Sequence, residues 1–281
     1  MPNAAGLSSG QPKHALGGAH NLPEVARDGA RLYYEAHGRG KPVVLLHGRG
    51  GNTLIWWQQI DAIAARYRCI VIDHRGWGRS TGPMVDPWVE MFAADLAAIL
   101  QAEGVGELAL VAQSMGGYTA NTVCSRFPGR VRAAVMSGTT GGHAPAAMLD
   151  VQRQAGETSE SMRIAWSEGR GPHPAVGARM YQEQPALARL YEMINGLNQN
   201  PPAAGFRAAR PDLVPLAVPS ATLFITGEED PLCPTAMVEA TAAELPGSRV
   251  LRIPSAGHST YFERAAEYNR ATLGFLGEVY G

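Results

Sequence analysis

The sequence predicts an α/β fold in which a mostly parallel, twisted sheet carries helices on both faces. Short, continuous apolar runs recur along the chain, as is typical of parallel strands that are buried on both faces. Amphipathic helical patterns separate most of these runs. The alternation stops once, between residues 143 and 218, where only helical patterns occur. We therefore expect a core domain of residues 23–142 and 219–281, with residues 143–218 inserted between two strands as a helical cap, or lid.

The composition is that of a soluble globular protein with a sizeable core, since 45% of the 281 residues are hydrophobic and 17% are charged. A formal net charge of −1 gives no electrostatic reason to expect a nucleic acid or an anionic membrane as a partner. Cys69, Cys124 and Cys233 lie far apart without the spacing of metal ligands, which favours buried thiols in a reducing compartment. We expect no metal and no cofactor.

Residues 1–22 are rich in small and polar residues and predict a flexible tail. They lack the charged start and the unbroken apolar stretch of a secretory signal. No segment approaches the roughly 18 apolar residues that a membrane span needs. These observations predict a cytoplasmic protein that does not bind a membrane.

The first elements form a predicted antiparallel edge, because the turn signal Asp28-Gly29 separates two strand patterns at residues 25–27 and 31–36. Asp86-Pro87 predicts a helix start, with Asp86 as the N-cap and Pro87 as the first helical residue. The remaining strand patterns cover residues 42–46, 69–73, 108–112, 131–136, 221–226 and 249–253. The helical patterns cover residues 53–64, 86–104, 118–127, 235–245 and 261–279 in the core, and 146–154, 160–168, 178–184 and 185–197 in the cap.

The stretch around Ser114 has the pattern of a nucleophile at a sharp strand-to-helix turn. An apolar run ends in Ala112-Gln113-Ser114-Met115-Gly116 and continues as a helix. Small residues are needed two positions before and two positions after the serine, because the backbones nearly touch there. The pattern alone is weak, since a serine followed by small residues is more often part of an ordinary turn.

Other strands bring complementary side chains to the same edge, because sites in open α/β sheets form at the carboxyl ends of the strands. The strand at residues 221–226 is followed by Glu228, Glu229 and Asp230, and the last strand is followed by His258. A serine hydroxyl needs a base to take its proton, and the base needs a carboxylate to fix its tautomer. The chain order serine, acid, histidine differs from the orders of other serine-triad folds.

Five stretches together carry a resemblance to a known family. They are the loop at His47-Gly48, the Gly-rich loop at residues 73–80, the elbow at Ser114, residues 227–234, and residues 256–258. In this order and at these intervals they resemble the α/β-hydrolase fold family, from about Ala26 to the end of the chain. Within it the sequence is similar to the capped, cofactor-free group of esterases, lactonases, haloperoxidase-like perhydrolases and carbon–carbon bond hydrolases. It departs from the family pattern at Ala112, where Gly is usual, and at Gln113, where His is common; neither departure removes a catalytic atom.

The resemblance implies roles for the triad residues. Ser114 would be the nucleophile and His258 the general base. Asp230, which directly precedes Pro231, matches the family's acid, with Glu228 and Glu229 as the alternatives.

The resemblance also implies an oxyanion hole made by the backbone N–H groups of Met115 and Arg49, which leaves the Arg49 side chain to solvent or to substrate. His47 would order its loop, His74 would be a packing residue, and His143 could approach the site from the start of the cap. Asp73 is a further candidate for the acid, but it precedes the nucleophile in the chain. It is instead expected to cap the Gly-rich loop through its own backbone.

The predicted pocket is largely apolar, with a few polar groups. Its candidate residues are Gly48, Trp77, Thr139, Met148, Trp166 and Leu232. The expected partner is a small-molecule substrate, and a homodimer is left open.

The expected function is a serine hydrolase that cleaves an ester, a lactone, a thioester or an activated C–C bond of a mainly apolar small molecule through an acyl-enzyme. The alternative is non-hydrolytic use of the same site, as in a lyase, a cyclase, a cofactor-free oxygenase or a ligand-binding receptor. An intact triad does not separate the two, because relatives of both kinds can retain it.

Overall fold

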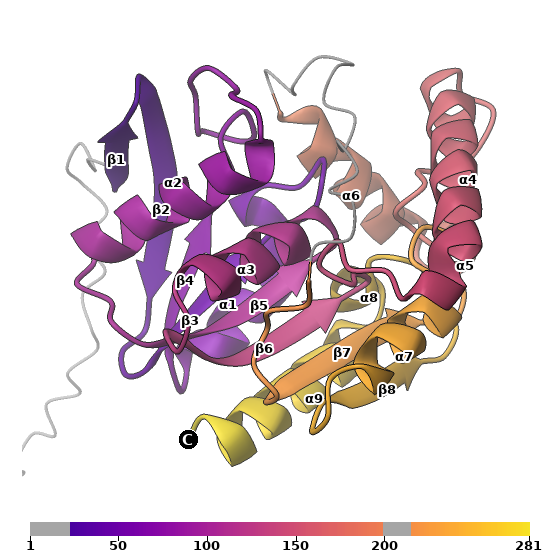
Figure 1. Cartoon of the computed structure of the whole chain (residues 1–281). Helices are drawn as coiled ribbons and strands as arrows, with labels where there is room; N and C mark the ends of the chain where they lie inside the picture. The colour runs from indigo at the N-terminus through magenta and orange to yellow at the C-terminus, as the bar shows by residue number, and fades with distance from the viewer. Residues whose placement is uncertain (1–22, 199–214) are drawn as a thin grey trace, which may run out of the picture.

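The computed structural model of the protein describes residues 23–198 and 215–281. Its centre is an eight-stranded sheet with the strand order β1-β2-β4-β3-β5-β6-β7-β8 (Figure 1). The strands are β1 (Glu24–Arg27), β2 (Ala30–His37), β3 (Pro42–Leu46), β4 (Arg68–Ile72), β5 (Leu108–Gln113), β6 (Val131–Ser137), β7 (Thr222–Gly227) and β8 (Arg249–Ile253). The pair β1–β2 and the pair β2–β4 are antiparallel, and all other neighbours are parallel. This arrangement confirms the predicted fold class.

Helices cover both faces of the sheet. One face carries η1 (Thr53–Trp56), α1 (Trp57–Ala64), α8 (Thr260–Glu263) and α9 (Ala265–Val279), and the other carries α2 (Trp88–Ala102), α3 (Met115–Arg126) and α7 (Thr235–Ala243). Successive residues of the central strands alternate between two hydrophobic cores: in β3, Val43 and Leu45 join one core, and Val44 and Leu46 the other. Both sets are fully buried, which explains why these strands have continuous apolar runs.

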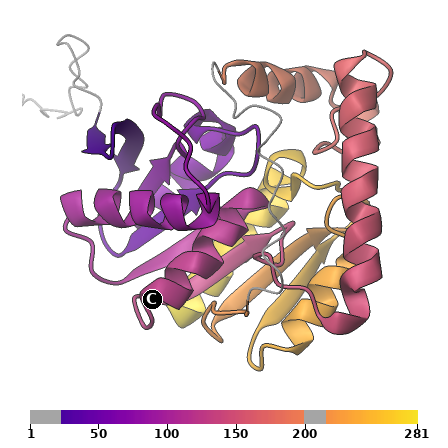
Figure 2. The same ribbon diagram turned by 45° about the horizontal axis from the view of Figure 1, so that its top comes forward.

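The segment predicted as the cap, residues 143–218, lies between β6 and β7 in the chain, and we call it the cap below. Its described helices are η2 (Ala146–Met148), α4 (Leu149–Ser167), α5 (Ala178–Glu183) and α6 (Pro185–Gly196). Figures 1 and 2 show these helices together at one end of the sheet, away from the C-terminus. Asn198, just after α6, donates to the carbonyl of Gly50 at 2.5 Å and accepts from the N–H of Gly78 at 2.8 Å. The end of α6 is therefore fixed to the loops that follow β3 and β4.

Some of the predicted helices differ from the structure. The patterns at residues 146–154 and 160–168 form one helix, α4, because the segment between them holds Gly156 but no proline and the helix continues through it. The helix predicted at residues 261–279 is divided at Arg264, whose φ of −132° is not helical. Pro87 is the N-cap of α2 rather than its first residue, because its ψ of 123° is extended.

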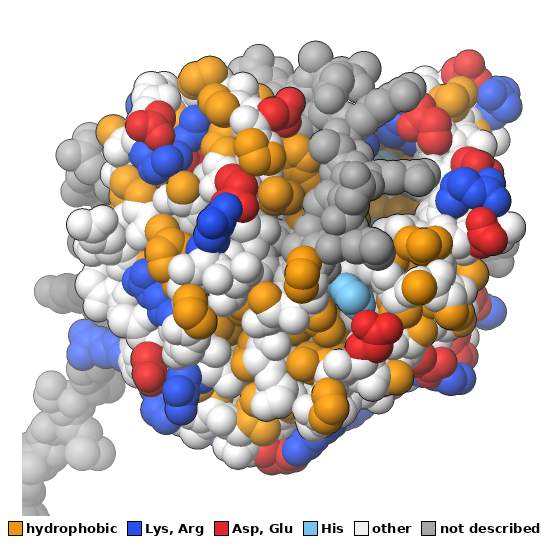
Figure 3. Space-filling model, in the orientation of Figure 1, with side chains coloured by type: hydrophobic (Ala, Val, Ile, Leu, Met, Phe, Trp, Pro, Cys, Tyr) orange, Lys and Arg blue, Asp and Glu red, His pale blue; other side chains and the backbone are white. Residues whose placement is uncertain are grey.

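Two parts of the predicted domain organisation lie outside the described residues: the tail at residues 1–22, and residues 199–214 of the cap. In the part of the chain that is described, no helix combines the length and the apolar character needed to cross a bilayer. Charged side chains of both signs are dispersed over the face shown in Figure 3.

Candidate active site

Ser114 occupies a strained turn between β5 and α3. Its φ of 49° and ψ of −116° lie in a region that non-glycine residues rarely adopt, at a cost of roughly 1–3 kcal/mol. The N–H of Ser114 is held by the carbonyl of Ser137 at 3.0 Å. A β-carbon at Gly116 would lie 2.2 Å from the carbonyl oxygen of Leu46. Glycine is therefore required at position 116 because the start of α3 lies very close to the neighbouring strand β3.

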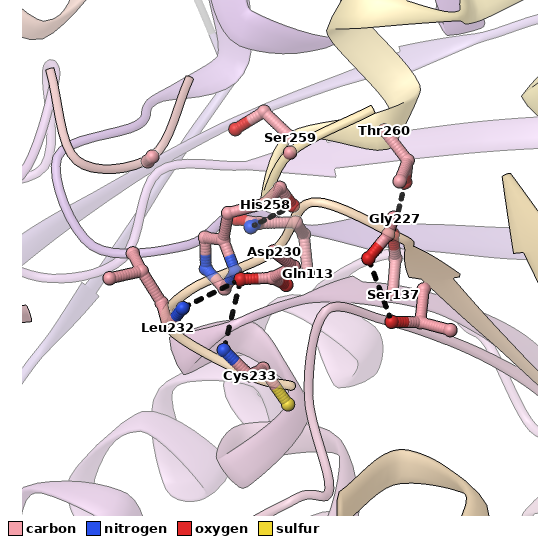
Figure 4. Close-up of polar contacts among 12 residues, drawn as sticks. Gln113, Ser137, Gly227, Asp230, Leu232, Cys233, His258, Ser259 and Thr260 are labelled. Carbon is pink, nitrogen blue, oxygen red and sulfur yellow. Dashed lines mark hydrogen bonds and ion pairs between the residues drawn. The ribbon is translucent and has the colours of Figure 1, made fainter. Parts of the chain in front are cut away.

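Asp230 and His258 form a buried pair in which the two carboxylate oxygens bond different partners (Figure 4). Oδ2 of Asp230 lies 2.8 Å from Nδ1 of His258, and Oδ1 accepts from the N–H groups of Leu232 at 2.8 Å and Cys233 at 2.9 Å. The carboxylate places the hydrogen of the neutral ring on Nδ1, which leaves Nε2 as the basic nitrogen. The pair therefore has the orientation that a general base requires.

The neighbouring carboxylates occupy other positions. Glu229 is exposed and pairs with Arg179 of α5 at 3.1 Å. Glu228 is also exposed, and its backbone N–H bonds the carbonyl of Ile253. Of these three neighbouring acids, Asp230 is the one that the structure brings to His258.

Two contacts place Ser114 and His258 at the same edge of the sheet. Gly138 directly follows the residue whose carbonyl holds the N–H of Ser114, and a β-carbon at Gly138 would lie 3.0 Å from Nδ1 of His258. Gln113, the residue before Ser114, has its Nε2 at 3.5 Å from the carbonyl oxygen of His258. The structure thus gathers all three predicted triad residues within one small region.

The loop after β3 passes directly beside the elbow. A β-carbon at Gly48 would lie 3.0 Å from Cβ of Ser114 and 1.9 Å from Oε1 of Gln113. The backbone N–H groups of Arg49 and Met115 have no acceptor among the described residues, so both remain available as donors. Two available N–H donors near Ser114 are what the predicted oxyanion hole requires.

The Arg49 side chain extends toward the cap helix α4. Although the residue is exposed as a whole, partial burial of its guanidinium and the nearby charge of Arg163 lower its pKa, whereas Glu160 opposes the shift. Arg49 therefore faces a mixed-charge region of the cap.

The other candidate histidines have partners of their own. Nε2 of His47 accepts from the N–H of His74 at 2.9 Å, and its Nδ1 donates to the carbonyl of Gly48 at 2.8 Å. Burial lowers the pKa of His47 to about 4, so the ring stays neutral and orders the loop. The ring of His74 packs against Phe92, and His143 pairs with Glu244 at 2.7 Å.

Asp73 fixes the Gly-rich loop that follows β4. Its carboxylate accepts from the N–H of Thr53 at 2.5 Å and of Arg79 at 2.7 Å. Burial raises the pKa of Asp73 to about 6, although these hydrogen bonds oppose the shift. All these contacts are to its own loop and to η1, which fits a capping role.

Two of the predicted pocket residues, Trp77 and Leu232, lie beside residues of the candidate site. Trp77 is buried in a cluster with Met115, and Leu232 packs on the core beside the Asp230 loop. Thr139 packs against α3 and accepts from the N–H of Gly141, and Met148 packs against the core that holds α2 and α3. Trp166, in the cap helix α4, packs against the ring of His173.

Sequence reasoning did not identify Glu263, a buried carboxylate in α8. Its Oε2 accepts from the N–H of Gly257 at 2.9 Å and of Gly177, in the cap, at 3.2 Å, and its Oε1 accepts from the N–H of Ser259 at 3.2 Å. The two amides that flank His258 are therefore held by one carboxylate, which also holds the cap. Burial raises the pKa of Glu263. The available signal was an acid that directly follows the aromatic pair Tyr261-Phe262.

Metal-binding side chains do not gather in this region. Within residues 23–198 and 215–281, no set of three or more histidine, cysteine or carboxylate side chains is arranged to hold a metal ion.

Comparisons with known proteins identify the fold family. A family model described as alpha/beta hydrolase fold matches residues 41–162, and a second, described as TAP-like protein, matches residues 204–278. The chain is similar to the serine hydrolase BPHL of Mus musculus, with 28% identity over 95% of this chain and 90% of that protein.

The chain is also similar to solved structures of hydrolases. Est816, described as an N-acyl homoserine lactone degrading enzyme, shares 30% identity with a TM-score of 0.71, covering 90% of this chain and 100% of that one. A thermophilic esterase from Thermogutta terrifontis shares 26% identity with a TM-score of 0.74, covering 90% and 95%.

Proposed function

The chain belongs to the α/β-hydrolase fold family and is an enzyme of the hydrolase type, and we propose that it cleaves an ester, lactone or thioester of a mainly apolar small molecule through a serine acyl-enzyme. The observation that carries this proposal is the buried Asp230–His258 pair, which lies at the same sheet edge as the strained Ser114. Similarity to proteins described as an esterase and as a lactone-degrading enzyme supports the substrate class.

In the proposed reaction, Oγ of Ser114 attacks the substrate carbonyl carbon while Nε2 of His258 takes the hydroxyl proton. The oxygen of the tetrahedral intermediate accepts hydrogen bonds from the N–H groups of Arg49 and Met115. Collapse of this intermediate breaks the bond to the leaving group, which receives the proton from His258. Asp230 stabilises the imidazolium that forms between the two proton transfers.

Water then resolves the acyl-enzyme. His258 takes a proton from the water, whose oxygen attacks the acyl carbon, and the proton is returned to Ser114 as the acid leaves. A site in which another acceptor replaced water would transfer the acyl group instead of releasing an acid.

The proposal is tested by turnover of short and medium p-nitrophenyl esters. The wild type should release nitrophenolate together with one equivalent of free acid, and Ser114→Ala should abolish both. Ser161→Ala, on the exposed side of α4, is the matched control and should retain wild-type rates. Turnover that persists in Ser114→Ala contradicts the nucleophile, and nitrophenolate release without free acid contradicts hydrolysis.

A further inference from the structure

His173 lies in the cap segment between α4 and α5 and contributes to no step of the proposed reaction. Its ring is buried and packs edge-on against Trp166, with ring centroids 4.6 Å apart, and against Tyr191, at 5.1 Å. Trp166 and Tyr181 in turn share the carboxylate of Glu192. The His173 ring is therefore held in a fixed position by a packed group of cap side chains.

The cap contacts both residues that flank His258. On one side, the hydroxyl of Tyr191, in α6, lies 3.1 Å from Oγ of Ser259. On the other side, a β-carbon at Gly257 would lie 2.6 Å from the backbone nitrogen of Gly177, directly after the turn that His173 begins. Since the His173 ring packs on Tyr191, these contacts bring it into the neighbourhood of His258, whose charge contributes to the lowered pKa of His173.

The hydrogen bonds of His173 fix its tautomer. The N–H of Ala175 donates to Nδ1 of His173 at 3.2 Å, so Nδ1 carries the lone pair and Nε2 carries the hydrogen. Nε2 has no hydrogen-bond acceptor among the described residues, and it is not completely shielded from solvent. Burial is the main cause that lowers the pKa of His173 to about 4; the charge of Glu192 opposes this shift and the charge of His258 adds to it, so the ring remains a neutral donor.

We propose that His173 is a substrate-binding residue whose Nε2–H donates a hydrogen bond to an acceptor oxygen in the leaving-group part of the substrate. This inference rests on the proposed serine hydrolase function. His258 must reach the leaving group in order to protonate it, so a donor beside His258 faces the same part of the substrate. The expected substrates are esters or lactones whose alcohol part carries a further ether, carbonyl or hydroxyl oxygen.

The test uses two hexanoate esters of nearly equal shape, the n-butyl ester and the 2-methoxyethyl ester, in which an ether oxygen replaces one methylene. kcat/KM for each is measured by acid release in a pH-stat, and the methoxyethyl-to-butyl ratio is compared between proteins. His173→Phe keeps an aromatic ring against Trp166 and Tyr191 but removes the donor. The ratio should fall about three- to tenfold relative to the wild type, which is the usual worth of one hydrogen bond. Comparison with the wild type cancels the different reactivities of the two alcohols.

Two controls separate a lost hydrogen bond from a general disturbance. His37→Phe makes the same change on β2, where His37 pairs with Glu35 and lies opposite the start of β4, and should keep the wild-type ratio. His173→Gln restores a side-chain N–H and should recover part of the preference.

Equal ratios in the wild type and His173→Phe would overturn the role of His173 and leave the proposed function intact. A His173-dependent preference for an oxygen in the acyl part, measured with n-butyl 3-methoxypropanoate against n-butyl pentanoate, would overturn the leaving-group assignment. Ester turnover that is insensitive to Ser114→Ala would instead contradict the proposed function itself.

Discussion

Asp230 divides its two oxygens between the backbone of its own loop and the ring of His258. Asp230→Asn should keep the loop, because the amide oxygen can still accept from Leu232 and Cys233. The amide N–H₂ would then face Nδ1 of His258 and stabilise the tautomer with its hydrogen on Nε2, which cannot act as a base. We expect kcat to fall by about 10³–10⁴, as in serine protease triads, measured with p-nitrophenyl esters.

The matched control is Glu229→Gln, which changes a neighbouring exposed carboxylate that pairs with Arg179. It should leave kcat close to the wild type. A similar loss in both variants would mean that the loop, and not the Asp230–His258 bond, determines activity.

Asp73 gives a prediction for stability against pH. Its pKa is raised from 3.8 to about 6 in the folded protein, so between these values the folded state binds more protons than the unfolded state. The stabilising contribution of Asp73 is therefore largest below pH 4 and falls as the pH rises to about 6, by up to about 3 kcal/mol.

Urea unfolding of the wild type and of Asp73→Asn from pH 4 to pH 7 measures this effect. The wild type should lose stability relative to the variant as the pH rises through this range. Asp61→Asn, in an exposed position of α1, is the control. A difference between wild type and Asp73→Asn that does not change with pH would contradict the raised pKa.

At the scale of elements, the cap and the loop that carries His258 are held by the same side chain. Glu263 accepts from the amides of Gly177, Gly257 and Ser259, and Glu263→Gln would offer a single oxygen to these three donors. We expect kcat to fall about tenfold or more with a smaller change in KM, because misplacing a catalytic group by a fraction of an ångström is costly. Amide hydrogen exchange should become faster in residues 171–177 and 257–259 together.

Glu239→Gln, at an exposed ion pair of α7 with Arg252, is the control and should change neither quantity. Faster exchange confined to the cap, with kcat unaltered, would show that Glu263 holds the cap without positioning His258.

The strands and the elbow could be predicted because their patterns are local. A parallel strand buried on both faces requires a continuous apolar run, and β3 to β7 all have one. The sequence patterns predicted two helices where the structure has the single helix α4, because a local pattern does not show whether a helix continues through a segment of lower helix propensity such as the one that holds Gly156.

The supports of the site could not be predicted in the same way. Glu263 and His173 act through backbone amides and rings of segments far away in the chain, and nothing in the spacing of their own neighbours indicates those contacts. The resemblance favoured Asp230 as the acid over the neighbouring Glu228 and Glu229, but only the folded loop shows which carboxylate meets His258.

For the molecule as a whole, residues 1–22 provide a simple test of the domain boundaries. The sheet begins at Glu24, so a chain that lacks residues 1–22 retains every described strand and the candidate active site. We expect the truncated protein to keep wild-type kcat/KM for p-nitrophenyl esters and a similar Tm. A large drop in Tm would show that these residues contribute to the folded core.

The central claim is that one serine at the strand-to-helix elbow forms a covalent intermediate. A fluorophosphonate should label the wild type with a single adduct, seen as one mass shift of the intact protein and mapped by peptide sequencing to Ser114. Labelling should be much slower in His258→Ala and absent in Ser114→Ala. An unlabelled wild type, or an adduct that persists in Ser114→Ala, would contradict the account.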